Sequence, residues 1–136
     1  MTRAILLKIS SIISLIFAAG HSMGGLKKWS PMGDNAVLKA MSDVHFPVYG
    51  QSRSYLDFFM GFGWSLSVSM LVQAAILWQM SKIDAADSKI VRSMTAVFIA
   101  ATLASSAISG VFLFLMPVLF SLALLVPLIA AYVAKK

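Results

Sequence analysis

Residues 53–80 have the sequence RSYLDFFMGFGWSLSVSMLVQAAILWQM, which indicates what class of protein the chain forms. From Tyr55 to Met80 it is almost continuously apolar, and it exceeds the ~20 residues that a helix needs to cross the hydrocarbon layer of a bilayer. Arg53 and Asp57 stand at its start. Charges at the mouth of a membrane span are costly unless they are paired or functional. The stretch therefore predicts a membrane helix with a candidate site at its N-terminal end.

The composition of the whole chain agrees with a membrane protein. Of its 136 residues 60% are hydrophobic and only 12% are charged, whereas charged residues make up about a quarter of a soluble domain. The net charge of +6 comes from lysines and arginines at the ends of apolar runs. This distribution is typical of topology signals and of contact with membrane lipids, and it argues against a nucleic-acid partner. The absence of cysteine excludes disulfides and thiolate chemistry.

Four apolar runs of spanning length predict four membrane helices, at about 4–21, 54–81, 89–110 and 116–134. The last two runs adjoin, and we expect the chain to turn near Gly110 and Pro117, because glycine suits a helix C-terminus and proline suits a first turn. Small residues such as Ala100 and Ala104 predict that the third helix packs closely against its neighbours. The expected fold is all-α: a single domain over 1–136 that forms an integral membrane four-helix bundle.

Counting basic residues predicts the orientation of this bundle. Seven lie on the side of the two termini: Arg3, Lys8, Lys82, Lys89, Arg92, Lys135 and Lys136. The other four are Lys27, Lys28, Lys39 and Arg53. The positive-inside rule then places both termini in the cytoplasm and a long loop, 22–53, outside. Within this loop we expect Asp34 to cap a short amphipathic helix from Ala36 to Met41, lying in the membrane interface.

The start of the helix expected at 54–81 carries the candidate site. Arg53 and Asp57 are four residues apart, so on a helix they share a face, which continues through Gly61 and Trp64. One hypothesis makes Asp57 an acceptor or proton carrier for a ligand, with Gly61 and Gly63 making space. The other has Asp57 paired with Arg53, or capping the helix through Ser54, and the two glycines admitting a neighbouring helix. The spacing leaves both open.

Two further residues complete the predicted ligand-binding set, which is His21, Arg53, Tyr55, Asp57, Gly61 and Trp64. His21 follows the first expected helix, and we expect it to end that helix by bonding a carbonyl or a loop side chain. The alternatives are a His-Asp proton relay with Asp57, or a metal site with Asp43 and His45. No spacing demands them, and no nucleotide-binding or hydrolase motif is present. We therefore expect no metal, no cofactor and no catalytic residue.

Several motifs resemble a group of small bacterial four-helix integral membrane proteins of uncharacterised function. They are Gly20-His21-Ser22, Trp29-Ser30-Pro31, the segment from Arg53 to Gly63, and Leu77-Trp78-Gln79. The resemblance implies a multi-pass protein of the bacterial inner membrane and supplies no catalytic residues. In outline the architecture is also similar to DoxX-like proteins and to sterol-isomerase-related proteins that bind lipids in an intramembrane pocket. The absence of glutamate departs from the acidic pairs of such isomerases.

These observations predict a protein that binds a small hydrophobic or lipid-like molecule at the outer leaflet. One alternative is an isomerase-type enzyme in which Asp57 or His21 transfers a proton. Another is a structural accessory subunit, or a homo-oligomer, whose small-residue helix docks onto a larger membrane complex.

Overall fold

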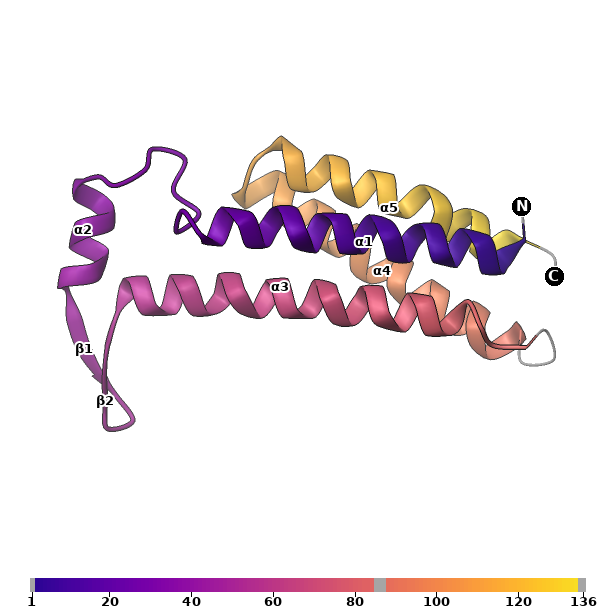
Figure 1. Cartoon of the computed structure of the whole chain (residues 1–136), viewed down its shortest axis with the longest axis horizontal. Helices are drawn as coiled ribbons and strands as arrows, with labels where there is room; N and C mark the ends of the chain where they lie inside the picture. Colours follow the sequence, from indigo (N-terminus) through magenta and orange to yellow (C-terminus); the bar gives the residue numbers. More distant parts are fainter. Residues whose placement is uncertain (1, 85–87, 135–136) are drawn as a thin grey trace. The chain divides into compact units, whose positions relative to one another are not determined.

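The computed structural model describes residues 2–84 and 88–134 (Figure 1). Within this part of the chain there are five helices and two strands: α1 (Arg3–Gly25), α2 (Ala36–Asp43), β1 (His45–Val48), β2 (Gln51–Ser54), α3 (Tyr55–Met80), α4 (Ser88–Phe112) and α5 (Leu115–Val133). The chain divides into two compact units. The first comprises the described parts of 1–17 and 71–136, and the second comprises 18–70.

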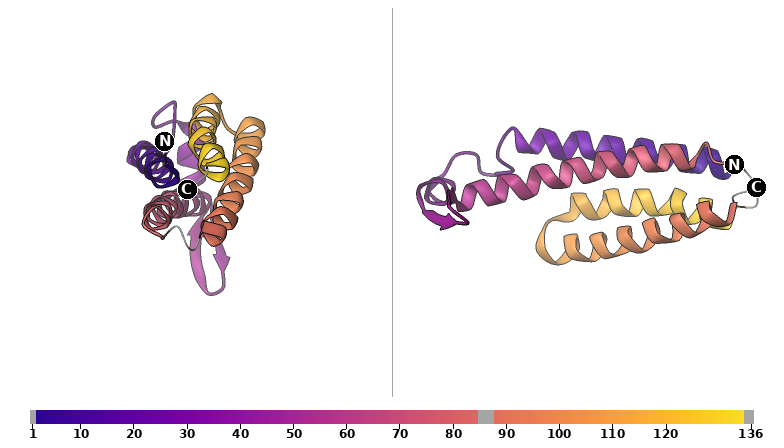
Figure 2. Two further views of the ribbon diagram at one scale, coloured as in Figure 1. Left: turned by 90° about the vertical axis from the view of Figure 1, so that its right-hand side faces the viewer. Right: turned by 90° about the horizontal axis from the view of Figure 1, so that it is seen from below.

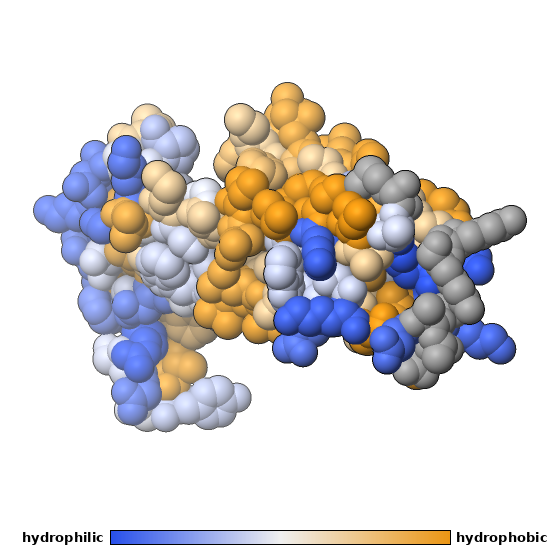
Figure 3. Space-filling model, turned by 45° about the vertical axis from the view of Figure 1, so that its right-hand side comes forward, coloured by the Kyte–Doolittle hydropathy of each residue, from blue (hydrophilic) through white to orange (hydrophobic). Residues whose placement is uncertain are grey.

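Four of these helices are long and apolar enough to cross a membrane: α1, α3, α5 and the Lys89–Phe112 part of α4. The shortest, α5, has 19 residues and so is roughly 28 Å long, close to the thickness of a bilayer core. On the face shown in Figure 3, apolar residues predominate along the middle of the long helices, and hydrophilic residues predominate around α2 and the strands. The chain is therefore a multi-pass membrane protein. Its orientation stays a prediction, and two of its basic residues, Lys135 and Lys136, lie outside the described residues.

The expectation of a purely helical fold is wrong in one segment. Inside the loop expected at 22–53, β1 and β2 form an antiparallel hairpin in which His45 pairs with Ser54 and Val48 pairs with Gln51. Tyr49 and Gly50 form the turn between them, with φ values of 45° and 82°. Two successive residues with positive φ make the two-residue turn whose twist suits an antiparallel pair.

The first helix continues one turn beyond its predicted end at residue 21. It ends at Gly25, where the Gly24 carbonyl accepts hydrogen bonds from the backbone N–H groups of Lys27 and Trp29, at 3.0 and 2.9 Å. His21 therefore lies inside α1 and does not terminate it, which corrects the expectation from the sequence. The third spanning helix, α4, likewise passes the predicted end at Gly110 and stops at Phe112.

The short helix expected in the loop is present, but Asp34 does not cap it. The cap is Asn35, whose side-chain oxygen accepts hydrogen bonds from the N–H groups of Val37 and Leu38, at 2.9 and 3.0 Å. Asp34 forms an ion pair with Lys28 instead, at 3.2 Å. An amide oxygen at the N-cap satisfies two helix donors that would otherwise lack a partner.

Within the first unit, α4 and α5 lie side by side as an antiparallel pair (Figure 2). A buried apolar cluster of this unit draws on all four long helices: Leu6, Leu7, Leu77, Met80, Val91, Leu124, Leu128 and Ala131. Arg3 closes the C-terminal end of α5, because its guanidinium donates to the carbonyls of Ala131 and Ala134, at 3.2 and 2.7 Å. A cation at this end also favours the helix dipole.

On α4, hydroxyl-bearing residues are buried and the alanines expected to pack are not. Thr95 and Thr102 are buried, and each hydroxyl donates to a carbonyl of its own helix at 2.7 Å. Ala100, Ala104 and Ala107 are exposed. Each threonine hydroxyl thus finds its acceptor within its own helix, as threonine and serine do in apolar helices, and the three alanines do not pack inside this unit.

Candidate functional site

A reciprocal pair of hydrogen bonds starts α3. The backbone N–H of Ser54 donates to Oδ2 of Asp57 at 2.8 Å, and the N–H of Asp57 donates to Oγ of Ser54 at 3.1 Å. This is a capping box, in which two residues three apart satisfy each other's backbone donors. Among the described residues Arg53 forms no ion pair with Asp57. The capping hypothesis thus accounts for where the carboxylate lies.

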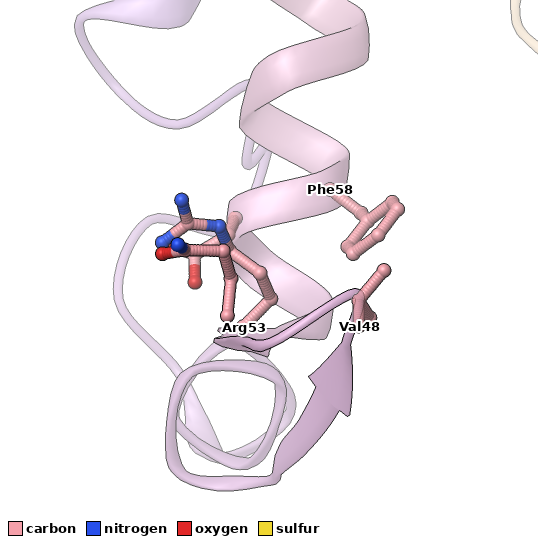
Figure 4. A pocket seen from close by; sticks show the side chains of 5 residues that line it. Val48, Arg53 and Phe58 are labelled. Atoms are coloured by element: carbon pink, nitrogen blue, oxygen red, sulfur yellow. The ribbon is translucent and has the colours of Figure 1, made fainter.

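Directly beside this cap, the hairpin and the first turn of α3 border a largely open hollow of about 330 Å³ (Figure 4). Its lining residues are Val48, Gln51, Arg53, Asp57 and Phe58. Because side chains alternate along a strand, Gln51 and Arg53 emerge on the same face of β2. Val48 and Phe58 lie together on one side of the hollow, and Arg53 lies on the other. The hollow therefore has an apolar side and a polar side.

Aromatic packing holds the apolar side in place. The ring of Phe58 stacks on that of Phe46, with centroids 5.8 Å apart and planes at 29°. Phe46, from β1, also contacts Tyr55 at 4.8 Å. Such pairs add roughly 0.5–1.5 kcal/mol beyond the area that they bury. They fix the hairpin against the start of α3.

The polar side of the hollow is free to meet a ligand. Within the described part of the chain, Arg53 makes one long hydrogen bond, from Nη1 to the Ser52 carbonyl at 3.4 Å. Asp57 uses Oδ2 in the cap, and no described residue donates to Oδ1. A guanidinium, an amide and one carboxylate oxygen thus stand beside two apolar side chains. This combination matches an amphiphile with hydrogen-bonding groups at one end.

A second cluster in the same unit centres on Trp29. Its indole N–H donates to the carbonyl of His21 at 2.9 Å. Its ring lies 5.4 Å from Trp64, 6.3 Å from Phe59 and 5.1 Å from His21, measured between centroids. We call these four residues the Trp29 cluster. An aromatic side chain of the loop thus fills the space that the sequence assigned to a ligand beside His21 and Trp64.

Three glycines make this position of Trp29 possible. A Cβ built on Gly24 or Gly25 would lie 2.9 or 2.8 Å from the indole, and one built on Gly63 would overlap it. By contrast, a Cβ on Gly61 would meet nothing within 4 Å. Gly63 therefore admits an indole, and not a neighbouring helix or a ligand. The predicted site residue Gly61 borders open space.

Both histidines form hydrogen bonds with residues of their own unit. Nδ1 of His21 lies 2.9 Å from Oγ of Ser67, which is buried. Nδ1 of His45 lies 3.1 Å from the carbonyl of Asp43. No group of three histidine or aspartate side chains suited to a metal occurs among residues 2–84 and 88–134. The His-Asp relay and the three-ligand metal site therefore gain no support from the geometry.

The predicted site residues thus fall into separate places. Arg53 and Asp57 line the hollow, whereas His21 and Trp64 belong to the Trp29 cluster. Tyr55 packs on the hairpin and does not line the hollow. Val48, Gln51 and Phe58 also line the hollow and were not predicted from the sequence. Gly50 was the available signal, because glycine readily adopts the positive φ that a two-residue hairpin turn requires.

Comparison with known proteins adds no assignment. No protein family, no curated protein and no solved structure matches this chain. The resemblance to small four-helix membrane proteins therefore stays a prediction, and the function must be argued from the site itself.

Proposed function

We propose that this multi-pass membrane protein binds an amphiphilic, lipid-like molecule in the hollow between the β hairpin and the start of α3. The observation that carries the proposal is the two-sided lining: Arg53, Gln51 and Asp57 face Val48 and Phe58 across about 330 Å³. The hollow lies where a 26-residue apolar helix begins. A ligand with one polar and one apolar end fits such a boundary better than a wholly polar solute.

The size of the hollow limits which part of the ligand it holds. A volume of about 330 Å³ is near the lower end for small-molecule sites. It suits a headgroup with the first segment of a tail. Phe62 lies one turn beyond Phe58 on α3, packs against it at 6.3 Å and is exposed, so it extends an apolar track away from the polar end. We propose that the remaining tail follows this track into the bilayer.

The chemistry of the rim points to an anionic headgroup with a hydroxyl or amine. Arg53 provides the charge, since guanidinium groups bind phosphate and carboxylate in a two-pronged geometry. Oδ1 of Asp57 can accept a hydrogen bond from a hydroxyl or amine. In the proposed topology the termini are cytoplasmic, and the hollow opens at the outer leaflet of a bacterial inner membrane.

No specific observation favours the other two functions. Asp57 caps α3 through Oδ2 and His21 contacts Ser67, and neither interaction favours proton transfer to a substrate. The exposed alanines of α4 would suit an accessory subunit. A small-residue face alone does not say what covers it.

Lipid analysis of the purified protein tests the proposal. Protein purified in a mild detergent is extracted, and the bound molecules are identified by mass spectrometry for wild type, Arg53→Gln and Lys39→Gln. Lys39 is the matched control, because it is an exposed cation of α2 outside the hollow. We expect one amphiphile enriched over bulk lipid in wild type and Lys39→Gln. Its amount should fall on the order of tenfold in Arg53→Gln, since a charged hydrogen bond is lost.

A second pair of variants tests the apolar side. Phe58→Ala should lower the retained amount, whereas Phe112→Ala should not, because Phe112 is exposed at the end of α4. Bulk phospholipid alone in the wild type, or equal retention by Arg53→Gln, would contradict the proposal.

A further inference from the structure

Basic side chains gather in the first unit, and two of them have clear structural partners. Arg3 donates to the carbonyls at the end of α5. Arg92 lies over the ring of Tyr132, with its guanidinium carbon 4.5 Å from the centroid. Lys8 and Lys82 differ, because both ammonium groups lie against one ring: Nζ of Lys8 is 5.6 Å and Nζ of Lys82 is 6.0 Å from the centre of Trp78.

We propose that Lys8, Lys82 and Trp78 bind the headgroup of an anionic phospholipid. The three residues come from α1, from the segment just after α3 and from the last turn of α3. Tryptophan and lysine at the end of an apolar helix are typical of the membrane interface, where the long lysine side chain can reach the headgroups. Two ammonium groups held against one ring concentrate positive charge there, and an anionic headgroup would neutralise it.

The residues around this cluster leave its donors available. Among the described residues, neither Lys8 nor Lys82 has a carboxylate within 4.0 Å. The ion pair found in that part of the chain joins Lys28 and Asp34, which belong to the other unit. Trp78 is 41% exposed, and its indole N–H has no acceptor among the described residues. Two ammonium groups and one N–H are the donors that the oxygens of a phosphate diester require.

The surface next to Lys8 indicates a lipid as the source of the phosphate. Ile12 and Leu15 follow Lys8 at helical spacing, and both are exposed. They form an apolar strip that leads from the ammonium group along α1, which is itself long enough to cross the bilayer. An acyl chain attached to the bound phosphate can lie along this strip. A soluble phosphate would leave the strip unused.

Native mass spectrometry tests this site. Wild-type protein in detergent is mixed with equal amounts of phosphatidylglycerol and phosphatidylcholine, and the two adducts are compared. We expect the phosphatidylglycerol adduct to dominate. The adduct ratio should fall on the order of tenfold in Lys8→Gln/Lys82→Gln, since each lysine near the surface favours anionic lipid severalfold. Lys27→Gln/Lys39→Gln removes the same charge elsewhere and should keep the wild-type ratio.

Further variants and ligands distinguish a lipid site from unfolding of the variant and from a site for soluble anions. Lys8→Arg/Lys82→Arg should keep the preference, and it provides a folded variant if the glutamine pair is unstable. Brominated phosphatidylglycerol should quench tryptophan fluorescence more than brominated phosphatidylcholine, and Trp78→Phe should remove that difference. Displacement of the lipid by free glycerol phosphate would identify a site for soluble anions and overturn the proposal. An unchanged ratio in the glutamine pair, or an equal fall in the control pair, would overturn it too.

Discussion

At the scale of single residues, Trp29 has the most consequential position in the second unit. Its backbone has a φ of 47°, in the left-handed region that side chains rarely adopt. The indole hydrogen bond to His21 and the contact with Trp64 compensate for this conformation. The indole fits because Gly24, Gly25 and Gly63 have no side chain. The loop is thus anchored to the helix ends of its own unit.

Gly63 and Gly61 provide a matched test of this anchor. In Gly63→Ala the new methyl group would overlap the indole of Trp29, and we expect a loss of about 1–3 kcal/mol in unfolding free energy from overpacking. Gly61→Ala meets open space and should gain up to about 1 kcal/mol from helix propensity. Thermal unfolding in detergent and tryptophan emission measure both. Equal behaviour of the two variants would show that Trp29 does not lie on Gly63.

The capping box makes a second prediction at this scale. Ser54→Ala removes the acceptor for the Asp57 N–H and should lower stability by about 1 kcal/mol. Ser52→Ala, an exposed change two residues earlier on β2, is the control. Hydrogen exchange at the first turn of α3 reports the effect locally. Unchanged exchange in Ser54→Ala would mean that the cap does not hold the start of this helix.

At the scale of elements, periodicity and composition predict the long helices well and the loop poorly. The apolar runs predict four spans because each run must exceed the bilayer core. The structure of the loop depends on which of several neighbouring polar residues forms each hydrogen bond, and composition does not determine this. Asp34 and Asn35 are both good caps, and the ion pair of Asp34 with Lys28 leaves the cap to Asn35. Pro47 lies in β1, and because proline is uncommon inside strands, the sequence around it did not indicate a strand.

The cap of α2 can be tested by replacing Asn35 and its neighbour Asp34 with alanine, one at a time. Asn35→Ala should destabilise α2 by about 1 kcal/mol, because the Val37 and Leu38 N–H groups lose their acceptor. Asp34→Ala removes an exposed ion pair and should leave α2 unchanged. Hydrogen exchange of the α2 amides distinguishes the two. Greater exchange in Asp34→Ala than in Asn35→Ala would restore the assignment made from the sequence.

The candidate site was located from sequence only in part. Arg53 and Asp57 were found because charge in front of an apolar run is rare. The hollow also includes Val48, Gln51 and Phe58. They come close to Arg53 and Asp57 only when the β1–β2 hairpin forms and packs on α3, which spacing along the sequence does not show. The sequence predicted Trp64 on the face of Asp57 and His21 at the end of the first helix, but both rings contact Trp29, which comes from the loop. Spacing along one helix cannot reveal such an insertion.

At the scale of the whole molecule, the defining feature is the four helices that are long and apolar enough to span a membrane. The chain has no cysteine, so single cysteines can report the side of the membrane. Met32→Cys lies between α1 and α2, Ile83→Cys lies just after α3, and both positions are exposed. An impermeant maleimide should label Met32→Cys in intact cells and Ile83→Cys only after lysis. Equal labelling of both would contradict a spanning α3, and reversed labelling would contradict cytoplasmic termini.

The most direct test of the proposed function places a photoreactive side chain in the hollow. A benzophenone amino acid at Val48, which lines the hollow, is compared in native membranes with one at Val44, which is exposed outside it. After illumination, intact mass analysis should show an adduct of one defined amphiphile at position 48 and only bulk phospholipid at position 44. The same bulk phospholipid adducts at both positions would contradict the proposal that the hollow is a specific binding site.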